Sequence, residues 1–304
     1  MTETLLIFYV RTARRKAMAC AVEEALLLLD DLEAAAPKGG PLGERGGLFW
    51  ITLPDRSLEA AGRRFPRLGY TYAVDLLEPV HGRSGSKGER SSNEVSWRGV
   101  TYRPMRVYEE DPALVREGAP DRRVFALEGS DGQDRLIRGY RGDGGTLSRR
   151  ALAVCDARLL VNLVHTGPGA VFLDPFAGAG GVVIEAIASG YRVLSSDQDP
   201  ILRPGLERLG SSHRIANAGD LPYPSGSVDV IATEPPFDPE ADGVVRKAIP
   251  ELHRVLTEGG KLAVLCAEGG ADGLREEAEA VGFTKWFDSP LNRKGMDCVV
   301  LAWV

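Results

Sequence analysis

The segment Phe172-Leu-Asp-Pro-Phe-Ala-Gly-Ala-Gly-Gly181 carries the strongest structural signal in this 304-residue chain. Apolar residues typical of a strand run into a glycine-rich turn, and helix-forming residues follow the turn. Such a turn lets backbone approach a ligand closely and presents N–H groups at the start of a helix. The dinucleotide fingerprint G-x-G-x-x-G is not met, because Val183 stands where its third glycine belongs. No Gly-Lys-Ser/Thr follows, which also excludes a phosphate-binding loop. The segment therefore predicts a cofactor-binding turn of another kind.

Outward from this turn, strand and helix patterns alternate over the second half of the chain. Strands are predicted at 171–173, 192–196, 212–216, 228–233, 261–266, 284–287 and 297–304, and helices at 149–164, 181–189, 201–209, 239–256 and 271–281. The last two strands have no helix between them, which predicts one antiparallel strand at an edge. The pattern indicates an α/β fold with a Rossmann-like, doubly wound, mostly parallel seven-stranded sheet. Ligands of such folds bind at the carboxyl ends of the strands.

The first half of the chain has a different pattern and a different charge. Residues 1–150 hold 24 Lys/Arg against 22 Asp/Glu, whereas residues 151–304 hold 13 against 21, within a net charge of −6. Strands are predicted at 5–10, 48–53 and 70–77, helices at 14–33 and 58–65, a polar loop at 81–99 and a hairpin at 122–140. We expect a smaller α+β domain over residues 1–140, a boundary in 139–145 and a second domain over 146–304.

Several classes of protein are disfavoured by composition. The four cysteines form no C-x-x-C pair and the four histidines have no ligand spacing, so we expect no metal site and a reducing, cytoplasmic location. No apolar stretch approaches the roughly 20 residues of a membrane span, and the first residues do not resemble a signal peptide. The oligomeric state is not predicted.

The extended glycine segment resembles a known motif. Asp174-Pro-Phe-x-Gly-x-Gly-Gly181, followed by Ile184-Glu-Ala, resembles the first motif of class I S-adenosylmethionine-dependent methyltransferases. More narrowly, it is similar to the family that methylates exocyclic amines of RNA and DNA bases. The resemblance implies S-adenosylmethionine as cofactor, with four residues of the motif at its site: Asp174, Phe176, Gly178 and Gly180.

Two further acidic residues follow in the order of that family. An acidic side chain after the second strand can accept hydrogen bonds from both ribose hydroxyls, and we assign this role to Asp197. Asp199 directly precedes Pro200, which is typical of a helix N-cap. After the third strand, the resemblance implies that Asp220 accepts from the adenine amino group; the alternative is a carboxylate that stabilises a turn.

The segment Thr233-Glu-Pro-Pro-Phe237 ends the fourth strand and resembles the (Asp/Asn/Ser)-Pro-Pro-(Tyr/Phe/Trp) signature of amino-methyltransferases. An exocyclic amine is a poor nucleophile, since its lone pair is delocalised into the ring. Hydrogen bonds from its N–H groups to Glu234 and to the Pro235 carbonyl would aim that lone pair at the methyl group. Pro236 would stiffen the segment, and Phe237 would stack on a base that has left its helix.

This segment departs from the family pattern at two positions. Glu234 replaces the usual Asp and is one methylene longer, and Asp238 replaces a glycine that often follows. Misplacement of a reacting group by about 1 Å can cost on the order of 10²-fold in rate.

The rest of the chain resembles the same family more loosely. Residues 146–163 look like the helix that precedes its first motif, and residues 57–70 look like the N-terminal region of tRNA guanine-N2 methyltransferases with a THUMP-type RNA-binding module. Basic residues there could contact phosphates, although they can equally form a solvated helix face: Arg11, Arg14, Arg15, Lys16, Arg63, Arg64 and Arg67. Near the C-terminus, Asn292-Arg-Lys-Gly295 reads as a basic loop before the last strand, on the side where the resemblance implies that substrate enters. Arg293 is a candidate there, and a solvated loop is the alternative.

The resemblance implies a methyltransferase acting on an exocyclic amine of a nucleic-acid base, foremost guanine N2 in tRNA, with RNA as partner. One alternative is a methyltransferase for DNA adenine or for a small-molecule or protein amine. Another is an RNA-associated protein that binds S-adenosylmethionine but is catalytically impaired, which the Glu234 substitution suggests. The modified nucleotide is not predicted.

Overall fold

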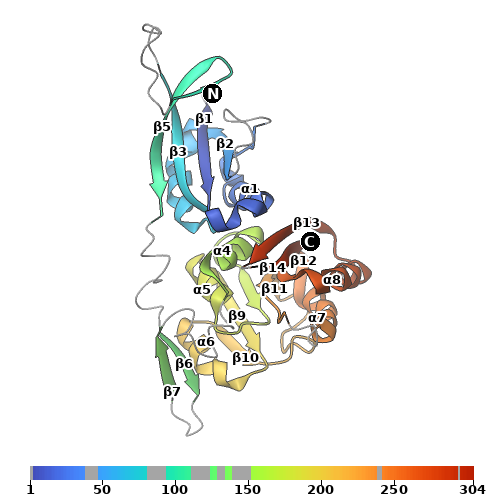
Figure 1. Cartoon of the computed structure of the whole chain (residues 1–304). Coiled ribbons are helices and arrows are strands. Elements are labelled where there is room, and N and C mark those ends of the chain that lie inside the picture. Colours follow the sequence, from blue (N-terminus) through green and yellow to red (C-terminus); the bar gives the residue numbers. More distant parts are fainter. Residues whose placement is uncertain are drawn as a thin grey trace. The chain divides into compact units, whose positions relative to one another are not determined.

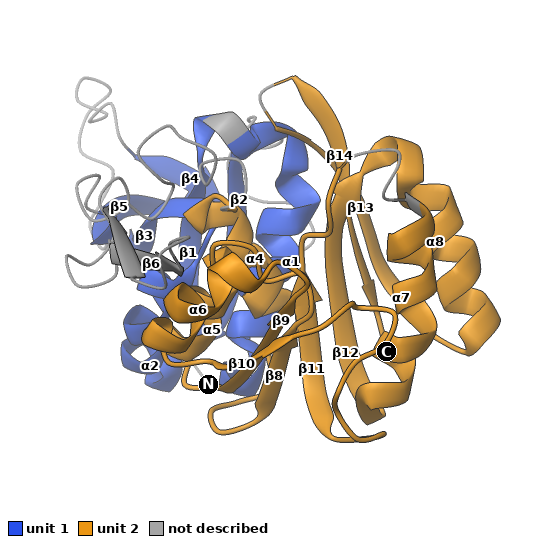
Figure 2. Cartoon of the chain, turned by 90° about the horizontal axis from the view of Figure 1, so that it is seen from below, with its two compact units in different colours: residues 1–111 blue, residues 112–304 orange. Residues whose placement is uncertain are grey.

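The computed structural model describes residues 3–37, 47–80, 94–110, 124–128, 134–138, 152–237, 242–293 and 295–304. The chain forms two compact units, Met1–Asp111 and Pro112–Val304, which carry different colours in Figure 2. The boundary expected in 139–145 and most of the polar loop expected at 81–99 lie outside the described residues, as does Asp238.

The second unit is built on a seven-stranded sheet in the order β10-β9-β8-β11-β12-β14-β13 (Figure 1). Its strands are β8 (Val171–Asp174), β9 (Arg192–Asp197), β10 (Ser212–Ile215), β11 (Val228–Thr233), β12 (Leu256–Ala267), β13 (Lys285–Arg293) and β14 (Met296–Trp303). All neighbours pair in parallel except β14, which runs antiparallel to both β12 and β13. The predicted fold class, with its single antiparallel strand, is confirmed. The prediction that the antiparallel strand lies at the edge is wrong, since β14 lies between β12 and β13 and β13 is the edge strand.

Helices cover both faces of this sheet, as a doubly wound fold requires. Figure 2 shows α7 (Asp242–Val255) and α8 (Glu268–Val281) on one face, and α4 (Val154–Leu163), α5 (Gly181–Ala188) and α6 (Arg203–Leu209) on the other. The apolar runs 230–232 of β11 and 262–267 of β12 follow from this double coverage. Ile231, Leu262 and Val264 are at most 2% exposed and pack against apolar residues of α7 and α8.

The junction between α7 and β12 differs from expectation. A helix at 239–256 is predicted to end before a strand at 261–266, but β12 begins at Leu256, directly after α7. Gly259 has φ +72° inside this strand, and the register with β11 shifts between Val228 and Val230. A Cβ on Gly260 would lie 2.9 Å from the Asp229 carbonyl oxygen, so the glycine here permits the close approach of the two strands.

The first unit is an antiparallel sheet in the order β2-β1-β3-β5-β4 (Figure 1). Its strands are β1 (Glu3–Val10), β2 (Leu48–Pro54), β3 (Thr71–Pro79), β4 (Val95–Trp97) and β5 (Val100–Glu109), with helices α1 (Met18–Leu28) and α2 (Leu58–Arg64). The helix expected at 14–33 is α1 flanked by 3₁₀ turns at Thr12–Ala17 and Asp30–Leu32. A separate two-stranded sheet, in the second unit, pairs β6 (Val124–Glu128) with β7 (Asp134–Arg138), where the hairpin is predicted.

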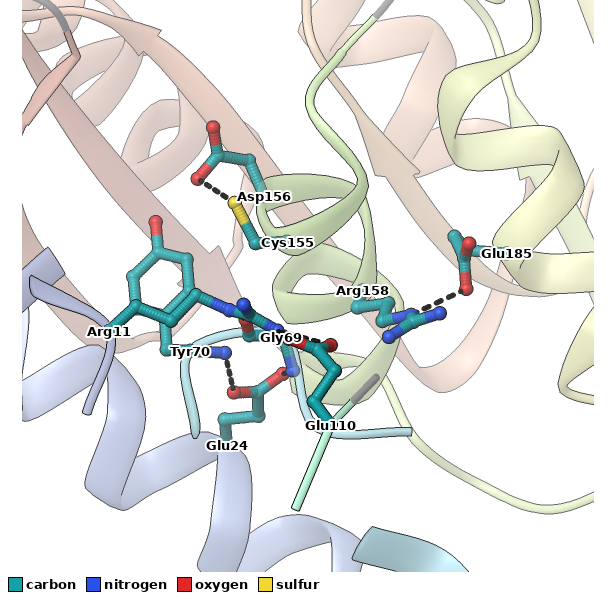
Figure 3. Close-up of polar contacts among 9 residues, drawn as sticks. All are labelled: Arg11, Glu24, Gly69, Tyr70, Glu110, Cys155, Asp156, Arg158 and Glu185. Carbon is teal, nitrogen blue, oxygen red and sulfur yellow. Dashed lines mark hydrogen bonds and ion pairs between the residues drawn. The ribbon is translucent and has the colours of Figure 1, made fainter. Parts of the chain in front are cut away.

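A buried carboxylate ties α1 to the chain that enters β3. Glu24 is fully buried, and its two oxygens accept the N–H groups of Gly69 and Tyr70 at 2.7 and 2.9 Å (Figure 3). Arg11 donates to the Gly69 carbonyl at 2.6 Å and forms an ion pair with Glu110. These contacts satisfy charges that would otherwise be costly to bury. Arg11 therefore has a structural role in this unit.

Candidate active site

Asp174 fastens the start of the glycine turn to a neighbouring strand. It ends β8 and is 1% exposed, and its Oδ1 accepts the Phe176 N–H at 3.2 Å and the Thr233 hydroxyl at 2.7 Å. Burial raises the pKa of Asp174 to about 7, against the lowering effect of these two hydrogen bonds. The carboxylates of Asp197 and Glu234 raise the pKa further. Asp174 thus joins the ends of β8 and β11, where the two predicted motifs meet.

This buried carboxyl predicts a pH-dependent stability. Because the folded pKa of about 7 lies above the unfolded value near 4, stability is complete below pH 4 and is lost as pH rises through 7. The loss amounts to at most about 4 kcal/mol. Asp174→Asn keeps an acceptor oxygen and removes the titration. We expect the free energy of unfolding of the wild type to fall relative to that of Asp174→Asn between pH 5 and 8, measured by urea denaturation.

Asp288→Asn is the control for this experiment. Although burial opposes the change, hydrogen bonds from Arg275 and Lys285 lower the pKa of Asp288, so its contribution is lost only as pH falls below its unfolded value near 4. Its unfolding curve should stay parallel to that of the wild type between pH 5 and 8. Parallel curves for Asp174→Asn as well would contradict the raised pKa.

The glycine turn itself is held by the acid that ends β9. Gly178 and Gly180 have φ +49° and +79°, a region that residues with a Cβ rarely adopt. The Gly178 N–H donates to Asp197 Oδ2 at 2.9 Å, and the Asp199 N–H donates to Oδ1 at 2.9 Å. Asp197 therefore couples the turn after β8 to the turn after β9. Each of its oxygens has a second lone pair with which it could accept from a ligand.

The two other predicted acids lie in turns next to this site. Asp199 caps the 3₁₀ turn Pro200–Leu202, because its Oδ1 accepts the Ile201 N–H at 3.2 Å, which confirms the predicted N-cap. In the turn after β10, Asn217 Oδ1 accepts the Gly219 N–H at 2.8 Å. The Asp220 side chain is exposed. The alternative role of Asp220, stabilising the turn, is thus performed by Asn217.

The segment after β11 presents a paired carboxylate. Glu234 is half-buried and forms an ion pair with Arg293 through its Oε1. Burial raises the pKa of Glu234, and the charge and hydrogen bond of Arg293 oppose that rise. Pro235 is buried, whereas Pro236 is exposed. The Arg293 guanidinium also lies 5.5 Å from the centroid of the Phe237 ring.

Sequence reasoning missed one member of this cluster, Asp156, and placed the candidate Arg293 in a basic loop. Arg293 instead ends β13, and its side chain is only 21% exposed. Its Nε lies 3.2 Å from Oδ2 of Asp156, a fully buried residue of α4. No local sequence pattern predicts that Asp156, Glu234 and Arg293 form a cluster, because they are far apart in the sequence.

Helix α4 is also tied to the helix that follows the glycine turn. Arg158 Nε donates to Glu185 Oε2 at 3.1 Å, and Figure 3 shows this contact beside that of Cys155 Sγ with Asp156 Oδ1 at 3.7 Å. Gly181, the first residue of α5, lies so close to the chain before α4 that an added Cβ would be 3.0 Å from the Leu152 nitrogen. These contacts keep Asp156 near the ends of β8 and β11.

The predicted site residues thus follow the carboxyl ends of four adjacent strands, β10, β9, β8 and β11. This edge combines a glycine turn, acidic acceptors and a carboxylate–proline–proline–aromatic segment. Among the described residues, no group of three or more His, Cys, Asp or Glu side chains could hold a metal ion. Within the same ranges, no helix has both the length and the apolar character needed to cross a membrane.

Comparison with known proteins identifies similar chains. No family model matches. The chain is 32% identical over 122 residues to the tRNA (guanine(10)-N2)-dimethyltransferase of Methanothermobacter thermautotrophicus, covering 36% of each protein. It is 35% identical over 127 residues to the probable tRNA (guanine(10)-N2)-dimethyltransferase of Methanothermococcus thermolithotrophicus, covering 36% of this chain and 76% of that one.

Of the first two curated relatives, the matched region spans 36% and 50% of the length. The crystal structure of TrmN from Thermus thermophilus shares the fold over 99% of both chains, with a TM-score of 0.52 and 14% identity. The likeness in fold therefore extends over both units, whereas the sequence similarity is confined to part of the chain.

Proposed function

This chain belongs to the methyltransferase family of the tRNA (guanine(10)-N2)-dimethyltransferases, and we propose that it methylates guanine N2 in RNA, foremost in tRNA, with S-adenosylmethionine as donor. The observation that carries the proposal is the Glu234-Pro-Pro-Phe237 segment, fixed at the end of β11 beside the glycine turn after β8. A glycine turn alone would support only cofactor binding. The Glu234–Phe237 segment adds two hydrogen-bond acceptors that can orient an aromatic amine and a ring that can stack on its base.

The residues at the strand ends fit S-adenosylmethionine. Gly178 and Gly180, which have positive φ, carry no side chain, so a cofactor could approach the backbone of this turn closely. The Asp197 carboxylate can accept hydrogen bonds from ribose hydroxyls. The exposed Asp220 carboxylate can accept from the adenine amino group. Nearby carboxylates also favour a cation over an anion. When bound, the cofactor supplies an electrophilic methyl group on a positively charged sulfur.

The chain's own contribution to the reaction is to orient the amine. Glu234 and the Pro235 carbonyl accept hydrogen bonds from its two N–H groups, and the Phe237 ring stacks on the extruded base. The nitrogen lone pair then points at the methyl carbon. When the nitrogen takes up the methyl group that the bound cofactor would supply, the amine proton that donates to Glu234 would be released to water.

Nucleoside mass spectrometry tests the proposed function. The protein, labelled S-adenosylmethionine and unmodified tRNA should yield labelled N2-methylguanosine, and Glu234→Ala serves as the control without transfer. Label only in DNA adenine or in a small-molecule or protein amine would contradict the RNA assignment. Cofactor binding without transfer to any of these substrates would indicate a catalytically impaired protein.

We assign RNA recognition to the N-terminal domain expected over residues 1–140, most of which is the first compact unit, Met1–Asp111. Arg63 supports this assignment, since its side chain is 72% exposed and its ion pair with Glu59, at i,i+4 on the same helix, is exposed as well. Arg64 is held instead by Asp31 and by the Leu28 carbonyl. Phosphate contacts give RNA binding a salt dependence that scales with their number.

Arg63→Glu should therefore weaken tRNA binding by the full chain and reduce the slope of log K against log salt by about 1. Arg203→Glu is the matched control, because Arg203 forms the same kind of i,i+4 pair with Glu207 on α6 of the second unit. Equal salt slopes for the two variants would contradict the assignment. Fluorescence anisotropy at several salt concentrations measures both.

A further inference from the structure

Arg293 contacts the two side chains that the proposed reaction gives a role in binding the substrate base, Glu234 and Phe237. Its Nη1 pairs with Glu234 Oε1, and its guanidinium carbon lies 5.5 Å from the Phe237 ring centroid. Its Nε lies 3.2 Å from Asp156 Oδ2, so the planar group spans a carboxylate on α4 and one after β11. An arginine suits such a bridge, since its donors form a rigid fork and its charge persists at all relevant pH.

The burial of these groups makes the bridge necessary. Asp156 is fully buried, and the side chains of Glu234 and Arg293 are 20% and 21% exposed. Without a cation between them the two carboxylates would repel each other, and the charge of Asp156 raises the pKa of Glu234. The titratable groups that face the Glu234–Arg293 pair come from three other elements: Asp156 of α4, Asp174 of β8 and Cys298 of β14.

We propose that Arg293 is the positioning residue for Glu234: it fixes the longer carboxylate through Oε1 and keeps it ionised, so that Oε2 accepts the N–H of the substrate amine. This inference rests on the proposed function. The ion pair with Arg293 explains how a glutamate can orient the amine at a position where the family motif usually has the shorter Asp. Glu234 has one more rotatable bond than Asp, and an ion pair to an anchored guanidinium removes that freedom.

A titration that requires no activity tests the ionisation. The pKa of Glu234 can be followed by NMR in protein labelled with ¹³C at the glutamate carboxyl carbon, with Glu234→Gln to assign the signal. Removing a neighbouring guanidinium is expected to raise the pKa by roughly 1 to 3 units in Arg293→Gln. Arg293→Lys keeps the positive charge, so the pKa of Glu234 should lie close to its wild-type value in that variant. An unchanged pKa in Arg293→Gln would overturn the proposal.

The pH profile of methyl transfer tests the positioning. In Arg293→Gln we expect the acid limb of kcat to move to higher pH by the same amount, and kcat at pH 7 to fall by about tenfold or more. Arg293→Lys should restore the acid limb but not the full kcat, because an ammonium lacks the fork that holds both carboxylates. A loss that follows thermal stability alone, with an unshifted pH profile, would show a merely structural role and overturn the proposal. So would faster transfer in Arg293→Gln, which would mark Arg293 as an obstruction to the base.

Arg275→Ala provides the matched control. Arg275 also forms an ion pair with a residue of β13, Asp288 at 3.0 Å, and its side chain is likewise 21% exposed. It touches neither Glu234 nor Phe237 in any contact described here. Its removal should leave the pH profile unchanged. If the wild type transfers no methyl group to RNA, the proposed function fails, and the NMR titration still decides the role of Arg293.

Discussion

Replacing Glu234 with alanine should reduce methyl transfer by about 10²- to 10³-fold while leaving the affinity for S-adenosylmethionine unchanged. The carboxylate lies at the end of β11 and its partner Arg293 comes from β13, whereas the proposed cofactor contacts come from the turns after β8, β9 and β10. The substitution therefore removes the acceptor for the amine without touching the cofactor's acceptors. Single-turnover kinetics and calorimetry measure the two quantities separately.

Glu234→Asp makes this prediction sharper. It restores the residue usual in the family motif, but it shortens the side chain that reaches Arg293. If the site has adapted to the longer carboxylate, misplacement by about 1 Å should cost on the order of 10²-fold in rate. Wild-type activity in Glu234→Asp would show that the extra methylene has no consequence. Wild-type activity in Glu234→Ala would contradict the proposed mechanism altogether.

The second large effect is expected at Asp197. Asp197→Ala should weaken S-adenosylmethionine binding by about 10²-fold, since hydrogen bonds to a charged group contribute about 1.5–3 kcal/mol each. The variant loses the proposed ribose acceptor and also frees the N–H groups of Gly178 and Asp199. Isothermal titration calorimetry measures the change in Kd.

A control variant and an altered ligand separate these contributions. Asp199→Ala removes a neighbouring acid that caps a 3₁₀ turn, so it should lower stability by about 1 kcal/mol with little change in Kd. A 2′-deoxy analogue of S-adenosylhomocysteine should bind the wild type more weakly than the parent compound. In Asp197→Ala the two should bind alike. Discrimination that persists in Asp197→Ala would refute the ribose assignment.

The strands missed by sequence reasoning are the ones with the weakest pattern. β5 is exposed at most positions along its length, and β4 is only three residues long. Without one buried face, the apolar and polar residues of a strand do not alternate with period two. The strands of the second unit are buried on both faces or bounded by glycine turns, and they were found.

The sequence by itself determined the glycine turn, the order of strands and helices in the second unit and the acidic residues that end the strands. These are local properties, because a turn, a cap or a buried strand depends on residues within a few positions of one another. Only the tertiary structure decided that Asp197 holds the Gly178 N–H and that Arg293 joins Asp156 to Glu234. An ion pair between residues 59 positions apart depends on where the β13–β14 hairpin places its end, and burial makes that pairing necessary.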